Sequence, residues 1–470
     1  MSRSRKAERR FNSMISRRRM LQASGMAGLL GIPGIVAARD SVDPTARASQ
    51  KEKSCIFLLL CGGPSHLDTW DLKPDAPDEI RGPYQPIATS TPGMQLSELH
   101  TRLATLTHHF CLIRSMTHPG SISNHFDAMH NCLSGQVSGK PDDSPYLGSV
   151  VAKVRPSQRN VVSYAWLIKC VGHPVFCAPN IGTGGHLGAV HAPVFVGSAT
   201  NHPAMPDFKP PEIYEVAAPD RMPERRRLLT ALDPATHSAD QTRREWHDLR
   251  QKAFGMVNGP DGRQAFELDR EPKSVRDRYG RHPLGQNLLM ARRLVEAGIG
   301  FVTVNGWTGP APGKGGGPPS SSWDMHGGHM GMGNAFGNGS YGMGWCLPRL
   351  DEALSALLLD LDERGMLENT LVVAMGEFGR SPKINTKGQP GRVHWPQCFS
   401  AIMAGAGIHG GAVYGESDKT GAYVKDNPVR PQDLGATIYH ALDVPLDTRL
   451  GNDGVSRPIT TGRPILELFG

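Results

Sequence analysis

Acidic and histidine side chains occur in four separate segments of the sequence, and their chemistry suits metal binding. The candidate ligands are Asp68, Asp324, His326, Glu377 and His394. Carboxylate and imidazole together are what a hard or borderline divalent metal ion needs, and zinc, manganese and calcium are the candidates. Each segment alone is a weak signal, because an acid can cap a turn and a histidine can pack on the surface. Taken together, the four segments predict a divalent metal site.

A fifth segment, residues 114–127, could supply a nucleophile or a further ligand. It follows a short apolar stretch at 110–113 and is expected to open a helix. Backbone N–H groups at a helix start favour anions, so a serine or histidine there is well placed for nucleophilic attack or ligation. The alternative is an ordinary N-cap followed by a polar helix.

Arg380, which follows Glu377 closely, has two interpretations. Its guanidinium could hold the oxygens of an anionic ester through a bidentate contact. Alternatively, it could simply pair with a neighbouring acid.

The candidate ligands lie next to apolar runs that are typical of buried strands. Residues 55–61 are continuously apolar and end at a Gly-Gly-Pro turn, which favours a strand of a parallel sheet, buried on both faces. Shorter apolar runs at 299–304, 371–375 and 399–404 predict three more strands. In open α/β sheets, ligands bind beyond the carboxyl ends of the strands, and the candidate residues cluster around these predicted strands.

Two helices are predicted between the strands. The first spans 283–297 and ends before Gly298. The second follows from leucines repeating at helical spacing over 347–361, with Pro348 in its first turn and Gly365 at its end. Alternating helices and buried strands predict an α/β fold with a largely parallel central sheet and helices on both faces.

The remaining organisation is expected to be a single domain over 55–470, reached through a linker at 39–54. The charged, helix-prone stretch at about 203–271 predicts a helical insertion. Residues 306–344 are rich in glycine and nearly free of aliphatic side chains, which predicts a long binding loop, a lid or a disordered segment.

The net charge of +7 over 470 residues comes entirely from the first 38 residues, which hold eight basic residues and one acid. The rest of the chain has 43 of each sign. It therefore has no global electrostatic footprint for nucleic acid or an anionic membrane, and we expect neither as a partner.

The same 38 residues predict a twin-arginine export signal. Arg17-Arg18-Arg19 precede a mildly apolar run at 20–36, and Ala37-Ala38 follow it as a small-residue cleavage pattern. The run is too short and too rich in glycine for a comfortable membrane span, so we expect no transmembrane span in the mature chain. The export machinery is then a partner and the protein is periplasmic or secreted. The alternatives are a disordered basic tail or an uncleaved anchor.

Five motifs in order along the chain resemble a large bacterial family of twin-arginine-exported proteins of unknown function, grouped with the alkaline phosphatase and sulfatase superfamily. They are Gly62 to Pro74, Ala291 to Gly298, Trp323 to His326, Gly376 to Arg380 and Gly391 to Pro396. Members of that superfamily hold one or two metal ions beside a nucleophile and hydrolyse phosphate or sulfate monoesters. The resemblance therefore implies an alkaline-phosphatase-like domain.

By analogy with the superfamily, Asp324, His326 and His394 are implied as the ligands of one metal site. Phe378 stands where the superfamily has a second-site histidine, so a second site would have to be built differently, from Glu377 with Asp68 or Asp71.

The resemblance also bears on the nucleophile and on how His394 is held. The segment 121–125 falls where the superfamily places its nucleophile, which makes Ser121, Ser123 and His125 candidates. Val393 replaces an acid that is more frequent in the family, so an outer partner of His394 is expected to be missing.

The function expected from these observations is a metal-dependent hydrolase of small anionic esters, or of sulfated or phosphorylated glycans. The alternative is a non-catalytic descendant of the same fold that binds a glycan or a protein through the Gly-rich loops. Another metal chemistry on the same scaffold, such as phosphodiester or phosphonate cleavage, is the third possibility.

Overall fold

The computed structural model describes residues 52–120, 122–137, 144–168, 184–214, 241–312, 322–451 and 454–470, with a few more between 221 and 231. The predicted export signal at 1–38 lies outside these residues, as do Ser121 and part of the Gly-rich stretch. Among the described residues, no helix has both the length and the apolar character needed to cross a bilayer.

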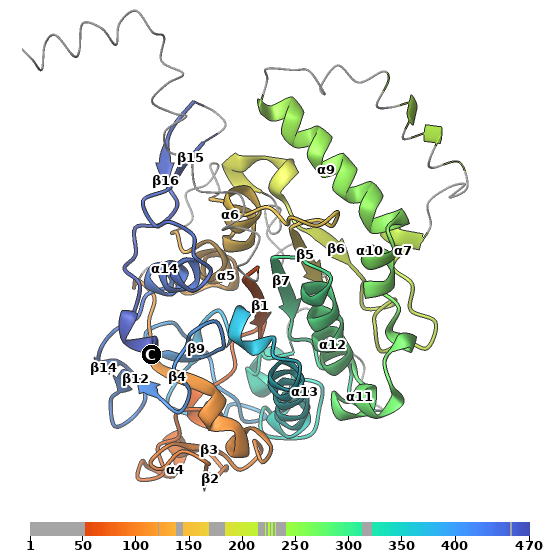
Figure 1. Ribbon diagram of the computed structural model, residues 1–470. Coiled ribbons are helices and arrows are strands. Elements are labelled where there is room, and N and C mark those ends of the chain that lie inside the picture. The colour runs from red at the N-terminus through yellow and green to blue at the C-terminus, as the bar shows by residue number, and fades with distance from the viewer. Residues whose placement is uncertain are drawn as a thin grey trace, which may run out of the picture. The chain divides into compact units, whose positions relative to one another are not determined.

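A central sheet organises the domain, and eight strands of the described chain form it (Figure 1). In sheet order they are β12 (Val413–Tyr414), β4 (Phe110–Met116), β11 (Phe399–Ala404), β8 (Thr370–Met375), β1 (Ser54–Leu59), β7 (Phe301–Asn305), β5 (Tyr164–Leu167) and β6 (Val194–Val196). All neighbours pair in parallel except β11, which is antiparallel to both β4 and β8. The sheet is therefore largely parallel, as predicted.

Both faces of the sheet are covered by helices. The side chains of β1 alternate between the faces: Ile56 and Leu58 belong to one buried cluster, Cys55 and Phe57 to the other. The first cluster contains α12 (Pro283–Glu296) and α13 (Met343–Glu363). The second contains α5 (His125–Ser134), α6 (Leu147–Val154) and α14 (Pro431–Ala441). Burial on both sides explains why the strand sequence is apolar throughout, and the predicted fold class is confirmed.

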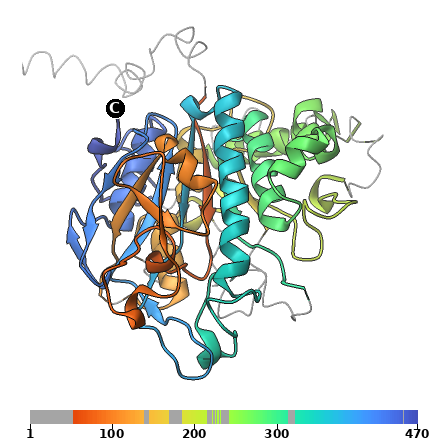
Figure 2. The ribbon, with the colours of Figure 1, turned by 90° about the horizontal axis from the view of Figure 1, so that it is seen from below.

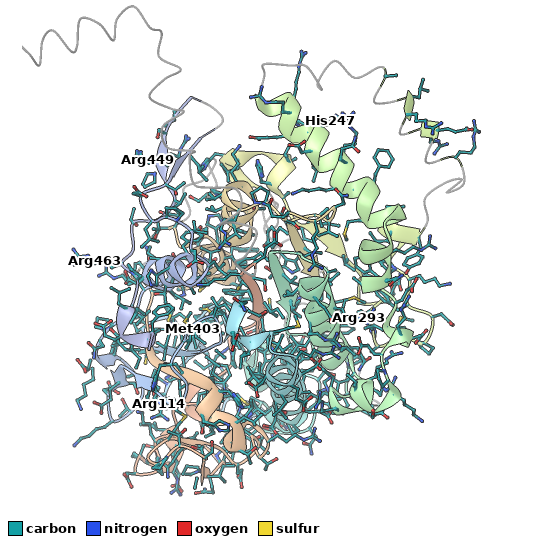
Figure 3. All side chains as sticks on the ribbon, in the orientation of Figure 1. Arg114, His247, Arg293, Met403, Arg449 and Arg463 are labelled. Atoms are coloured by element: carbon teal, nitrogen blue, oxygen red, sulfur yellow. The ribbon has the colours of Figure 1, made fainter. Side chains whose placement is uncertain are left out.

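Figures 1 and 2 show α12 and α13 side by side against the sheet, where they pack on each other. In Figure 3 the side chains fill the interior around Met403 of β11, whereas Arg449 and Arg463 lie at the periphery.

The predicted elements at 55–61, 283–297, 299–304, 371–375 and 399–404 correspond to β1, α12, β7, β8 and β11 within one or two residues. The helix predicted from Leu347 begins earlier, at Met343, so Pro348 lies inside α13 rather than in its first turn. Gly342 is the extended residue before this helix, and the first turn continues directly from the Gly-rich stretch.

The stretch predicted to be a helical insertion contains helices in its described part. These are α7 (Pro211–Tyr214), α9 (Gln241–Asn258), α10 (Pro260–Ala265) and a 3-10 turn at Leu268–Arg270. Further α-helices are α4 (Asp78–Arg81) and α11 (Lys273–Arg278). Other 3-10 turns span His66–Asp68, Leu103–His109, Gly185–Leu187, Ala189–His191, Gly327–Met330, Leu367–Asn369 and Leu466–Leu468.

Short two-stranded ladders complete the described elements. They pair β2 (Pro86–Ala88) with β3 (Gln95–Ser97), β9 (Gly379–Arg380) with β10 (His394–Trp395), β13 (Glu416–Ser417) with β14 (Val424–Asp426), and β15 (Arg449–Leu450) with β16 (Arg457–Pro458). Of these, the β9–β10 ladder follows β8 in sequence and carries His394 opposite Arg380.

The turn after β1 needs glycine for two reasons. Gly62 has φ +114°, a conformation that L side chains rarely adopt. A Cβ at this position would also lie 2.2 Å from the backbone nitrogen of Asp324. The segment carrying Asp324 is thus in close contact with the end of β1, and Trp323 N donates to the carbonyl of Cys61 at 3.3 Å.

We predict that Gly62→Ala destabilises the domain more than Gly93→Ala does. Gly93 also has positive φ, +83°, but nothing lies within 4 Å of a Cβ there. Gly93→Ala should therefore cost only the backbone strain of about 1–2 kcal/mol. Gly62→Ala adds the overlap with the Asp324 backbone and should cost at least twice as much in urea unfolding followed by tryptophan fluorescence. Equal losses would contradict the close packing at this turn.

Candidate metal centre

Four side chains from three separate segments meet beyond the carboxyl ends of the central strands. His125 is the first residue of α5, which follows β4, while Asp324 and His326 follow β7. His394 is held in β10 by its antiparallel pairing with Arg380 of β9, which in turn follows β8. Because the carboxyl ends of parallel strands meet at one edge, residues far apart in sequence converge there.

The ligand-type atoms of these four residues all lie within 4.8 Å of one another. His326 Nε2 is 2.8 Å from His394 Nε2 and 3.0 Å from Asp324 Oδ1. His394 Nε2 lies 3.6 Å from the same carboxylate oxygen, and His125 Nε2 lies 3.4 Å from Asp324 Oδ2. Asp324 is therefore at the centre of the group, with an imidazole nitrogen on three sides.

The group fits a divalent metal ion in both chemistry and spacing. Zinc binds histidine nitrogen and carboxylate oxygen at about 2.0–2.1 Å in tetrahedral geometry, which separates ligand atoms by roughly 3.3 Å. The separations of 2.8, 3.0 and 3.6 Å among Asp324, His326 and His394 bracket that value. Two imidazole nitrogens facing each other at 2.8 Å can share at most one proton, so at least one of them presents the lone pair that a metal ion binds.

Access to the group is from the side of His394. The side chains of His125, Asp324 and His326 are at most 9% exposed, whereas that of His394 is 23% exposed. A ligand would therefore approach past His394.

His394 is oriented by a backbone carbonyl rather than by an acid. Its Nδ1 lies 3.1 Å from the carbonyl oxygen of Ser123. A metal-binding histidine commonly donates its second N–H to such an acceptor, which fixes its tautomer. The outer partner expected to be missing next to Val393 is thus supplied by the segment preceding α5.

Glu377, a predicted metal ligand, lies outside the group of four. Its side chain is completely buried, and Oε1 lies 2.6 Å from His125 Nδ1. The carboxylate also accepts the backbone N–H of Gly62, at 2.9 and 3.1 Å. Glu377 therefore contacts the nitrogen of His125 that points away from Asp324.

Arg380, the predicted clamp on an ester, is turned inward instead. It is fully buried, and Nη2 donates to Asp324 Oδ1 at 2.6 Å and to the Gly62 carbonyl. Nε donates to the Gly63 carbonyl at 2.8 Å, and Nη1 to the Arg392 carbonyl at 3.0 Å. The guanidinium of Arg380 therefore hydrogen-bonds to three segments: the turn after β1, the segment of Asp324 and the segment that leads to His394. It holds these three segments together.

Asp68 is not brought to the group either. Its carboxylate pairs with Arg392, at 2.7 Å to Nε and 3.1 Å to Nη2, and both side chains are buried. Arg392 also donates to the carbonyls of Ser381, at 3.1 Å, and Ile80, at 2.7 Å. The Asp68–Arg392 pair therefore anchors the segment before His394 to the segment after β1.

Of the nucleophile candidates, His125 lies in the group and Ser123 borders it through its carbonyl, with an exposed side chain. Ser121 lies outside the described residues. Phe378 is buried against two members of the group, with ring centroids 4.9 Å from His125 and 4.4 Å from His394. An apolar ring therefore occupies the place where the resemblance expects a second-site histidine.

The charges of the group are mutually balanced. Burial alone would raise the pKa of Asp324, but the Arg380 guanidinium and the surrounding imidazoles hold the pKa of that carboxyl well below its usual range. Burial alone would lower the pKa of His125, but Asp324 and Glu377 outweigh it and raise the pKa to about 9. Burial lowers the pKa of His394, although Asp324 opposes the shift. His394 is therefore neutral at pH 7, whereas His125 is protonated there and would release that proton on binding a metal ion.

Two supporting residues were missed by sequence reasoning. The first is His118, whose Nε2 donates to the backbone carbonyl of Glu377 at 2.5 Å. Asn131 Nδ2 donates to Nδ1 of the same His118 ring at 2.9 Å. Arg392 is the other, through its pair with Asp68. Each of these residues stands in a quoted motif or segment, but its partner is distant in sequence, so no local pattern could have shown the contact.

Fold and site together define an α/β protein with a histidine–aspartate group of metal-binding type at the carboxyl edge of its sheet. The chain belongs to the family described as Protein of unknown function (DUF1501), whose model matches residues 52–469. Among proteins of curated function, none matches this chain.

Several solved structures are similar to this chain at low identity. A lipoteichoic acid synthase from Listeria monocytogenes has 11% identity, with 87% of this chain and 74% of that one covered and a TM-score of 0.37. A phosphonate monoester hydrolase from Silicibacter pomeroyi has 11% identity, coverage of 89% and 76%, and a TM-score of 0.36. A sulfatase from Pseudoalteromonas sp. has 12% identity, coverage of 85% and 70%, and a TM-score of 0.34. These are distant likenesses, and the chemistry of the site follows from its own side chains.

We predict that Arg380→Met lowers the free energy of unfolding by about 3–5 kcal/mol, because it removes the guanidinium that pairs with the buried Asp324 carboxylate. Arg380→Lys keeps the charge but cannot reach all of the acceptors that the guanidinium contacts, so it should show a smaller loss of the same kind. Both variants should also bind zinc more weakly. If Arg380 instead held the ester, Arg380→Lys would keep full stability and zinc affinity and raise only the KM for an ester.

Proposed function

We propose that this protein is a metal-dependent hydrolase of anionic esters, with a sulfate or phosphate ester as substrate. The observation that carries the proposal is the convergence of His125, Asp324, His326 and His394 on one point. The resemblance of the sequence motifs to the alkaline phosphatase and sulfatase superfamily supports the same reaction class.

In this proposal Asp324, His326 and His394 hold the metal, with zinc, manganese and calcium as candidates, and His125, the remaining member of the group, is the fourth ligand. A bound divalent ion would neutralise charge on the ester oxygens and lower the pKa of an attacking hydroxyl or water. The chain's own contribution is to fix the ligands: Arg380 holds Asp324, and the Ser123 carbonyl orients His394. One complete metal site is proposed, because Phe378 fills the space beside His125 and His394.

The attacking group is proposed to come from the segment 121–125 or to be a water held beside it. This segment borders the metal ligands through the Ser123 carbonyl and leads into α5, whose first N–H groups favour an anion. The substrate is proposed to be a small ester or a sulfated or phosphorylated glycan. Export through the twin-arginine machinery to the periplasm or beyond is also part of the proposal, supported by the pattern of the first 38 residues.

We predict that the mature chain, purified without chelator, contains about one equivalent of divalent metal by plasma mass spectrometry. His394→Ala should lose most of it, and its hydrolysis of a panel of sulfate and phosphate monoesters should fall by at least about 100-fold, since even outer partners of ligands commonly contribute 10–100-fold. The matched control is His440→Ala, a histidine on α14 that packs against Phe469. It should keep both metal and activity.

Two outcomes would contradict the proposal in different ways. A chain that retains its metal but hydrolyses no ester would be the non-catalytic, glycan- or protein-binding descendant. A chain without metal above background would return Asp324, His326 and His394 to a purely structural role.

A further inference from the structure

We infer that Glu377 is a positioning residue, which holds His125 in place as a metal ligand and does not bind the metal itself. The inference rests on the proposed metal site and adds to it the residue that sets the fourth ligand. From sequence alone, Glu377 was a candidate ligand.

The first argument is which edge of the His125 ring Glu377 contacts. Its Oε1 lies 2.6 Å from Nδ1, whereas Nε2 of the same ring faces Asp324 Oδ2 at 3.4 Å. The two nitrogens point in different directions from the ring. A carboxylate bound to Nδ1 therefore leaves Nε2 directed at the group of ligands, which is the usual arrangement of a carboxylate behind a metal-binding histidine.

The second argument is that the carboxylate is fixed by other contacts. Both oxygens of Glu377 accept the N–H of Gly62, and the side chain is completely buried. Gly62 is in turn packed against the backbone of Asp324. The carboxylate thus ties His125 to the same turn that supports Asp324, and it has little freedom to swing toward a metal.

The third argument is that the backbone of Glu377 also holds the segment leading to α5. Its carbonyl accepts His118 Nε2 at 2.5 Å and the Cys132 thiol at 3.5 Å. His118 is kept in the required tautomer by Asn131, which donates to its Nδ1. Glu377, which follows β8, therefore contacts residues before, at and after the start of α5 and helps to fix the position of His125.

A double-mutant cycle in the full mature chain tests the inference. The four proteins are the natural chain, Glu377→Gln, His125→Ala and the double variant, and the measurement is zinc affinity by competition with a chromophoric chelator. Glu377→Gln should weaken zinc binding by about 10–100-fold when His125 is present. In the His125→Ala background the same change should alter affinity by less than about threefold, because a residue that acts through His125 has nothing left to position.

A matched control separates positioning from general damage. Asp351, a buried carboxylate on α13, lies 3.8 Å from the buried imidazole of His100 and is not one of the proposed ligands. Asp351→Asn should leave zinc affinity unchanged. If Glu377→Gln does not fold, Glu377→Asp, which shortens the side chain but keeps the charge, replaces it in the cycle and should show a smaller, equally His125-dependent loss.

The outcomes distinguish this inference from the proposed function. Equal zinc affinity in Glu377→Gln and the natural chain would overturn the inference, as would an undiminished loss in the His125→Ala background, which would make Glu377 a ligand. A natural chain that binds zinc but cleaves no ester would overturn only the proposed function. A natural chain that binds none of zinc, manganese and calcium would overturn both.

Discussion

The contact between Arg380 and Asp324 is the interaction on which the rest of the site depends. A carboxylate that is almost fully buried costs several kcal/mol unless it is paired, and here the guanidinium makes a 2.6 Å hydrogen bond to it. The remaining donors of Arg380 are used on the backbone carbonyls of Gly62, Gly63 and Arg392. One cation therefore stabilises the central acid and fixes the three segments around it, which lets three imidazoles approach the same carboxylate.

The backbone at the end of β1 sets how closely these segments can pack. Gly62 has no Cβ, so the Asp324 segment can lie directly against the turn. The backbone N–H of Gly62 donates to the carboxylate of Glu377. Phe378 and Glu377 both contact His125. The Phe378 ring packs against the imidazole ring, and the Glu377 carboxylate hydrogen-bonds to its Nδ1. This is a compact arrangement around one group of ligands, with an opening on the side of His394.

Arg380 and Glu377 play other parts in the structure than their residue types suggest. Their types suggested a clamp on an ester and a metal ligand, and both residues do lie at the site. Whether an arginine or a glutamate contacts a bound ligand or other side chains of the protein depends on the direction in which its own side chain points. Burial decides that here, because Arg380 and Glu377 are both completely enclosed by groups that satisfy them.

The α/β class, the strands and helices that border the site, and most of the residues that meet there could be predicted from the amino-acid sequence alone. These features are local: apolar runs, helical spacing and turn glycines act within a few residues, and Asp324, His326 and His394 lie in short motifs. Which of these residues contact one another is seen first in the folded chain. The pairing of Asp68 with Arg392, the inward turn of Arg380, and the choice of His125 over Glu377 for the group of four depend on contacts across more than fifty residues. Such contacts follow from the order of the strands in the sheet, which no local pattern encodes.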